Sequence, residues 1–311
     1  MNTTRNRTHA YIAAVLYAAI IGLSFLFVKM TVTIAHPIDV LAHRFALSLI
    51  VVSIPVLFGW IKIHLRLADL WRIIPLGLLS PVLFFAFQAF GLVTSNSSEG
   101  GIIQAMVPVF TLVLASIFLK ERTTLMQKMS LLLSVAGVVY IFAMKGSGLS
   151  MSNMKGIVLL LLSALSFAGY GVLARPLTRK YKPLELTWVT LMVGCVVFNA
   201  ASFIRHAAAG SMVEYIQPLG DMSYLGALAY LAILSTMVST LLSSYALTHL
   251  EASRMSVFTN FSTLISIAGG ALILNEPVYS YHYIGALLII IGVLGTNISG
   301  RKHGLVSHPK A

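Results

Sequence analysis

Long, nearly continuous apolar stretches alternate along this chain with short polar connections. Each stretch holds about 20 residues, the length that an α-helix needs to cross a bilayer. Strands of a membrane barrel would instead alternate apolar and polar positions over about 10 residues. The pattern therefore predicts an all-α membrane protein with ten transmembrane helices, over residues 10–30, 38–58, 72–93, 99–119, 126–144, 156–176, 184–204, 224–247, 252–274 and 282–299.

The placement of Lys and Arg predicts the orientation, because cytoplasmic loops of membrane proteins are enriched in these residues. If the N-terminus is inside, 15 of the 21 Lys and Arg residues face the cytoplasm. Two more, Lys29 and Arg44, fall within helices, and four lie outside: Lys145, Lys155, Arg205 and Arg254. We expect a bacterial inner-membrane protein with both termini in the cytoplasm.

Composition supports a membrane protein and excludes several other classes. Hydrophobic residues make up 58% of the 311 residues and charged residues only 10%, against about a quarter in soluble domains. The net charge of +12 does not indicate a nucleic-acid partner, because the basic residues flank the membrane segments and form no aromatic-interleaved patch. A single cysteine, Cys195, excludes a disulfide within the chain, and no metal-binding spacing of histidines is present.

The two halves of the chain resemble each other at a shift of 155 residues. This shift carries Glu121 onto Glu276 and Gly137-Val138 onto Gly292-Val293. We interpret residues 1–147 and 148–300 as two repeats of five helices, followed by a cytoplasmic tail, 301–311. Because five is odd, the second repeat must enter the membrane upside down relative to the first, as in many transporters.

Motifs that occur in both halves resemble the drug/metabolite transporter superfamily, EamA type. An aromatic-small-Leu step ends the third and eighth helices, as Phe90-Gly91-Leu92 and Tyr245-Ala246-Leu247. A Leu-x-Glu step follows in each half, as Leu119-Lys120-Glu121 and Leu274-Asn275-Glu276, and a Gly-rich helix comes after it. Arg44 in the second helix and Pro108 in the fourth helix also fit the family pattern.

The resemblance implies two inverted five-helix halves around a central cavity, and export or exchange of small metabolites. The halves are not equivalent, however. Thr263 stands where the first half has Pro108, and Arg254 stands where it has Glu99. These departures argue against a strictly symmetric binding site.

Asp39, His43 and Arg44 form the densest ionisable group within the predicted helices. Ionisable residues in a membrane usually face protein or a water-filled cavity. Arg44 could form an ion pair with Asp39 or Glu99, or it could hold an anionic group of a solute. His43 could relay protons, although a plain hydrogen-bonded histidine is the more ordinary interpretation.

Further candidates for a substrate-binding cavity are the polar and aromatic residues of the helices. With Arg44, we expect that cavity to be lined by Gln88, Gln104, Tyr170, Trp188, Tyr245 and Asn260. For the three aromatic residues, ordinary packing between helices is the alternative to stacking on a solute. Asn260 belongs to a polar stripe with Thr263 and Ser266, which we favour as cavity lining over helix packing. Hydroxyls of the eighth helix, including Ser235 and Thr236, we assign to packing.

Three residues are expected to have gating or structural roles. Pro108 lacks a backbone N–H and should kink the fourth helix, which suits a gate. Glu121 and Glu276 are expected to end the fourth and ninth helices on the cytoplasmic side. We expect each to bond to neighbouring backbone or basic side chains.

These features together predict a secondary transporter and no enzyme activity or cofactor. No Gly-x-x-x-x-Gly-Lys-Ser/Thr loop for ATP is present, and neither is a Gly-x-Ser-x-Gly motif. A membrane-embedded enzyme and a channel remain the alternatives. The expected partners are the lipid bilayer and a small-molecule solute, with or without a coupling ion, and we expect no nucleic acid. The sequence leaves the solute open among amino acids, amines, nucleosides and drugs.

Overall fold

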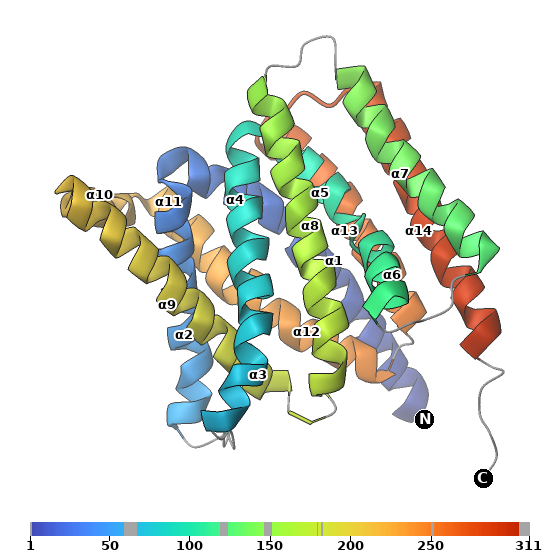
Figure 1. Cartoon of the computed structure of the whole chain (residues 1–311), viewed down its shortest axis with the longest axis horizontal. Coiled ribbons are helices and arrows are strands. Elements are labelled where there is room, and N and C mark those ends of the chain that lie inside the picture. Colours follow the sequence, from blue (N-terminus) through green and yellow to red (C-terminus); the bar gives the residue numbers. More distant parts are fainter. Residues whose placement is uncertain are drawn as a thin grey trace.

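A computed structural model describes residues 2–58, 67–118, 124–145, 151–178, 180–181, 183–249 and 252–304. In these ranges the chain is helical and contains no strand (Figure 1). The first half contains α1 (Asn2–Ile34), α2 (Pro37–Leu57), α3 (Leu67–Gly77), η1 (Leu78–Leu83), α4 (Phe84–Thr94), α5 (Ser97–Gln104), α6 (Val107–Phe118) and α7 (Leu125–Lys145). The second half contains α8 (Met151–Thr178), α9 (Pro183–Ala209), α10 (Met212–Ile216), η3 (Gln217–Gly220), α11 (Met222–Ala229), η4 (Tyr230–Val238), α12 (Ser239–His249), α13 (Ala252–Ile273) and α14 (Ser280–Gly304).

Seven helices of the described chain are long and apolar enough to cross a membrane, judged by length and composition. Three shorter apolar helices accompany them, over Leu125–Ile141, Phe261–Ile273 and Ser280–Gly292. The prediction of an all-α membrane protein is therefore confirmed. One element was not predicted: α10 and η3 form a short helical connection between the seventh and eighth predicted segments.

Local sequence chemistry explains several helix starts. Pro37 opens α2, where the missing N–H costs nothing, and the Nδ1 atom of His36 accepts a hydrogen bond from the backbone N–H of Ile38. Asn96 and Glu99 form a capping box at the start of α5. Such caps satisfy backbone donors that neither the helix nor lipid could pair.

Three predicted segments are interrupted near their middles. The third contains η1, a π-type turn where Ser80 has an extended backbone (φ −144°, ψ 118°). The eighth contains η4, another π-type stretch. A shift of 155 residues carries 78–83 onto 233–238, within η4, so the two irregularities occupy equivalent positions. The fourth segment breaks between Gln104 and Val107, directly before Pro108, whose ring excludes regular helix hydrogen bonding.

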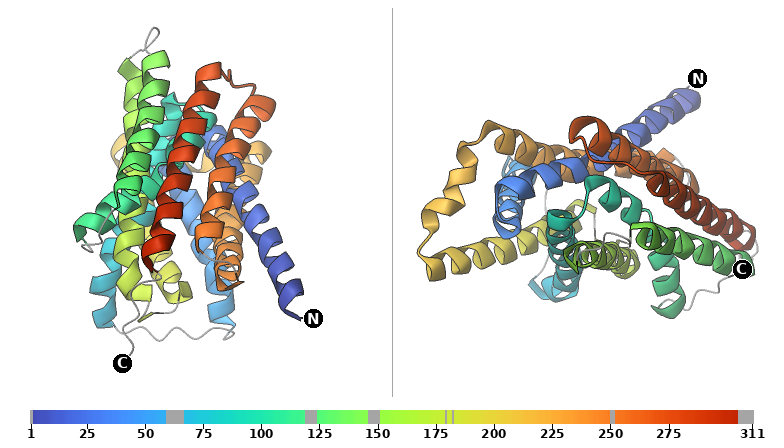
Figure 2. Two further views of the ribbon diagram at one scale, coloured as in Figure 1. Left: turned by 90° about the vertical axis from the view of Figure 1, so that its right-hand side faces the viewer. Right: turned by 90° about the horizontal axis from the view of Figure 1, so that it is seen from above.

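Helices of the two halves pack against each other in pairs. α7 and α14 lie side by side along one edge (Figures 1 and 2), α1 packs on α13, α4 on α8, and α2 on α9. Glycines allow the close approach: a Cβ on Gly137 would meet the backbone oxygen of Gly285 at 2.9 Å. Small residues at such seams are typical of membrane helices, which gain little from hydrophobic burial against each other.

The ends of the helices sort to opposite ends of the bundle. The start of α1 and the end of α14 lie at one end, whereas the end of α7 and the start of α8 lie at the other (Figures 1 and 2). We call the end with the α7–α8 connection the distal end. The turn from α1 into α2 also lies at the distal end. There Lys29, near the end of α1, donates to the carbonyl of Ser95, which follows α4.

Gly292 provides a direct test of the α7–α14 seam. We expect Gly292→Ala to lower the free energy of unfolding of the purified protein by about 1–3 kcal/mol. The added Cβ would lie 2.6 Å from the Ser130 backbone oxygen. The matched control is Gly226→Ala in α11, where a Cβ would meet nothing within 4 Å. Thermal unfolding in detergent measures both, and equal stability of the two variants would contradict this packing.

Candidate functional site

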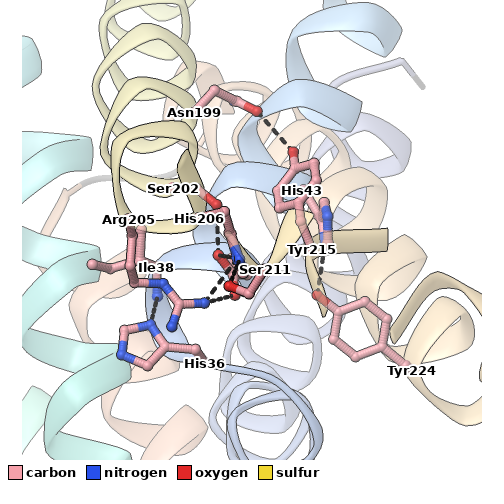
Figure 3. Close-up of polar contacts among 11 residues, drawn as sticks. His36, Ile38, His43, Asn199, Ser202, Arg205, His206, Ser211, Tyr215 and Tyr224 are labelled. Atoms are coloured by element: carbon pink, nitrogen blue, oxygen red, sulfur yellow. Dashed lines mark hydrogen bonds and ion pairs between the residues drawn. The ribbon is translucent and has the colours of Figure 1, made fainter. Parts of the chain in front are cut away.

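Asp39, Ser202, Arg205 and His206 form a polar cluster at the distal end, here called the Asp39 network, in which all but the half-buried Arg205 are buried (Figure 3). Asp39 lies in the first turn of α2, and the other three lie near the end of the antiparallel helix α9. Ser202 donates to Asp39 Oδ1 at 2.5 Å, Arg205 donates to Oδ2, and His206 Nε2 lies 3.2 Å from Oδ1. The cluster therefore ties α2 to α9 through a charged interaction shielded from solvent on the Asp39 side.

A second layer of polar side chains surrounds the network (Figure 3). His43 Nδ1 lies 2.9 Å from the Tyr224 hydroxyl, while its Nε2 atom is buried without a hydrogen-bond partner. Tyr215 of α10 stacks near His43, with ring centroids 4.5 Å apart, and donates to Asn199 at 3.0 Å. The unpredicted α10 thus packs its one tyrosine onto the polar face of α2 and α9.

An open pocket of ≈ 380 Å³ adjoins the network at the distal end. Its polar lining comprises His36, Asp39, Arg205, Glu214, Gln217 and Asp221. Desolvation and then the charge of Arg205 lower the pKa of His36 from its ordinary value, against an opposing effect of Asp39. At neutral pH His36 is therefore the uncharged acceptor that caps α2, and the pocket carries more acidic than basic charge.

Arg44 lies deeper in the bundle and is only 1% exposed. Its Nη2 atom lies 3.5 Å from Ser235 Oγ and 3.4 Å from Thr236 Oγ1, both in η4. Its guanidinium carbon lies 4.2 Å from the ring centroid of Phe85, two residues beyond η1. We call these four residues the Arg44 site. The irregular stretch η4 of the second half and helix α4 of the first half thus both contribute to the surroundings of one buried cation.

The predicted pairing of Arg44 with Asp39 or Glu99 is wrong. Asp39 is occupied by Arg205 and His206 across the α2–α9 contact. Glu99 caps α5, and its Oε1 atom lies 3.8 Å from His282. Both carboxylates lie near helix starts at the distal end, whereas Arg44 lies a further turn or more along α2.

The other predicted binding residues have varied surroundings. Gln88 is buried in α4, one turn beyond Phe85, and Gln104 is half-buried at the end of α5. Tyr170 is half-buried and stacks on Phe167 at 6.1 Å. Trp188 donates to Ser53 at 3.0 Å, joining α9 to α2. Tyr245 is 40% exposed.

Two predicted residues lie outside what the structure describes: Glu121 entirely, and the side chain of Asn260. In the same stripe as Asn260, Thr263 donates to the Gly101 carbonyl at 3.1 Å and Ser266 to the Ser97 carbonyl at 2.9 Å. These two hydroxyls join α13 to α5, which is the packing role given above as the alternative.

Glu276 lies at the opposite end of the bundle from the one predicted. Its carboxylate accepts from the backbone N–H groups of Ser97 and Ser98 and from both hydroxyls, at 2.8–3.2 Å. This agrees with a structural role. It places Glu276 at the distal end, opposite the chain termini, and not on the expected side with them.

Sequence reasoning missed Arg205, His206 and Phe85, and assigned Ser235 and Thr236 to packing alone. A signal for the first two was present: Asp39 opens one predicted helix, and Arg205-His206 closes another that ends on the same side. No sequence signal distinguished Phe85, because an aromatic residue among apolar neighbours is typical of a packed core.

Comparison with known proteins agrees with this architecture. The model of the EamA-like transporter family matches residues 8–143 and again 154–298, which is most of the chain. The chain belongs to the EamA-like transporter family. The resemblance inferred from the repeated motifs is confirmed.

Relatives of the chain are named as transporters. It is 50% identical to "Uncharacterized transporter YcxC" of Bacillus subtilis over 296 residues, 95% of each chain. It is 25% identical to "Probable amino-acid metabolite efflux pump" of Escherichia coli, covering 94% of this chain and 95% of that one. A solved crystal structure shares the fold with a TM-score of 0.55 at 15% identity, over 98% of this chain and 99% of that one. This EamA protein is therefore a membrane transporter.

The Asp39 network predicts strong coupling between α2 and α9. Asp39→Asn and Arg205→Gln should each lower stability, by about 2 kcal/mol or more for Asp39→Asn, because the remaining charges lose their partner. The double variant should lose at least about 1 kcal/mol less free energy of unfolding than the two single variants lose together. Unfolding in detergent measures the cycle, with the exposed pocket residue Glu214→Gln as control. Strictly additive losses would contradict the ion pair.

Proposed function

We propose that this protein is a secondary transporter that exports or exchanges small organic metabolites by alternating access. In this proposal, ten membrane-spanning helices form two inverted halves, residues 1–147 and 148–300. Both chain termini, including the tail 301–311, lie in the cytoplasm of a bacterium, and the helices span its inner membrane. The relative named for amino-acid metabolite efflux supports the outward direction and the solute class.

The observation that carries the proposal is the exchange symmetry of the helix contacts. α1 packs against α11, η4, α12 and α13 of the second half. α8, the first helix of the second half, packs against α3, η1, α4, α5 and α6 of the first half. α2 pairs with α9, and α7 pairs with α14. Exchanging the halves reproduces this list, which supports two structurally similar repeats related by an axis between them.

Such an arrangement provides a physical route to alternating access. If each half can adopt the other's conformation, the exchanged state has the same contacts with its opening on the opposite face. The free-energy difference between the two states then remains small enough for a solute gradient or a coupled ion to drive the cycle. The paired interruptions η1 and η4, at equivalent positions, are suited to such a change because they break regular helix bonding.

We place the solute between the two halves, where it contacts Arg44, Gln88, Gln104, Tyr245 and Asn260. In this proposal Tyr170 and Trp188 lie farther along the route that the solute takes through the protein. The buried Arg44 and Gln88 on neighbouring helices support this placement most directly. Pro108 is proposed to serve as a hinge in the fourth span, where α5 already separates from α6.

Counterflow into proteoliposomes tests the proposal. Vesicles loaded with unlabelled amino acids should accumulate the external labelled amino acid transiently, because a carrier exchanges solute through one alternating site. Alanine at each of Arg44, Gln88, Gln104, Tyr245 and Asn260 should reduce the rate by about tenfold or more where a hydrogen bond to solute is lost. Val213→Ala, on the exposed surface of α10, is the control.

The outcome distinguishes a carrier from a channel. A channel would equilibrate label without transient accumulation, and this would refute alternating access. Unchanged counterflow in all five alanine variants would refute the placement of the solute while leaving the transporter itself intact.

A further inference from the structure

Arg44 is a buried cation without an anion. Its side chain is 1% exposed, and within the described residues no carboxylate lies within ion-pair distance of it. Its Nε atom is buried with no hydrogen-bond partner. An unneutralised guanidinium in a membrane helix costs several kcal/mol, about 2.5–3.5 on insertion scales. A residue that stabilised only the fold would not be expected to remain in that condition.

The neighbours of Arg44 orient the guanidinium without satisfying it. The two hydroxyl contacts at 3.4 and 3.5 Å are long, beyond the usual 2.7–3.2 Å range of N–H···O bonds. The Phe85 ring at 4.2 Å stabilises one face of the cation. Ser235 and Thr236 contact Nη2 alone. The Nε–H group has no hydrogen-bond partner and is available to a ligand.

We propose that the Arg44 guanidinium binds the carboxylate of the transported solute. This inference rests on the proposed function and names its substrate class: small organic acids and zwitterions such as amino acids. A carboxylate matches the planar guanidinium fork through two parallel hydrogen bonds, including one from the unpartnered Nε. The Ser235 hydroxyl can rotate to donate to the same carboxylate, whereas the Thr236 hydroxyl donates to the Leu231 carbonyl at 2.9 Å.

The charge at the site favours a carboxylate over a phosphate. Arg44 supplies one positive charge, so a singly charged carboxylate leaves the buried pair neutral. A phosphate dianion would leave an uncompensated negative charge, which burial penalises strongly. The nearest polar group along α2, His43, is bonded to Tyr224, and Asp39 is already neutralised by Arg205.

The site is also assembled from both halves. Arg44 and Phe85 belong to the first half, and Ser235 and Thr236 belong to η4 of the second. A carboxylate held by Arg44 and the Ser235 hydroxyl would bridge the halves, so its binding would depend on their relative position.

Uptake by proteoliposomes tests the inference with matched compounds: L-phenylalanine, L-leucine and benzoate, each beside its primary amide, together with phenethylamine and inorganic phosphate. The wild-type protein should take up the acids at least about tenfold faster than the amides, amine or phosphate. Arg44→Gln should lose that preference, and Arg44→Lys should recover part of it. Arg72→Gln, an exposed arginine in α3, should behave as the wild type.

Thermal unfolding distinguishes a binding role from a structural one. Arg44→Gln removes an unneutralised buried charge, so its melting temperature should equal or exceed that of the wild type. A binding residue gives loss of acid uptake with unchanged or raised stability. A melting temperature lowered by several degrees would show that Arg44 supports the fold, and would overturn the inference.

The remaining outcomes separate this inference from the proposed function. Saturable uptake of amides or phenethylamine equal to that of the acids would preserve the transporter and refute the carboxylate site. Acid preference that persists in Arg44→Gln would refute it as well. No saturable uptake of any compound would contradict both.

Discussion

A polar group that leaves water for the interior of a membrane protein must find its partner within the protein. Lipid offers no hydrogen bonds, and each unmet group costs several kcal/mol. Most of the polar side chains described here obey this constraint. Lys29 donates to three carbonyls near the end of α4, Glu276 accepts four bonds at the start of α5, and Asp39 is held by Arg205, His206 and Ser202.

Those satisfied groups share a location. They lie at the distal end, where Glu276 and the Asp39 network join helices of the first half to helices of the second, and where Lys29 joins α1 to the end of α4. Arg44 departs from the rule deeper in the bundle, beside the irregular stretch η4. Departures from full polar satisfaction mark functional sites more often than errors of folding. This contrast is the basis for assigning structural work to Glu276 and Asp39 and solute binding to Arg44.

The sequence predicted the helices well and the side-chain partners poorly, for physical reasons. A run of about 20 apolar residues has one stable solution in lipid, the α-helix, so the helical class could be recognised from composition alone. The partner of Asp39 depends on which helices become neighbours, and Arg44, five residues away, looked closer than Arg205, which is distant in sequence. Helix α10 is short and lies outside the apolar runs, so the pattern of apolar residues did not predict it. The π-type stretch η4 places the Ser235 and Thr236 hydroxyls beside Arg44, a contact that regular helical periodicity did not indicate.

The central claim is that two inverted halves enclose one shared site, and its most direct test is topology. In a Cys195→Ala background, single cysteines can be placed at the exposed Met154 of α8 and at the exposed His9 of α1. Intact bacterial cells are then treated with a membrane-impermeant maleimide. The account predicts that Met154→Cys is labelled and that His9→Cys is labelled only after the cells are opened. Equal labelling of both positions in intact cells would place them on one face and contradict the inverted arrangement.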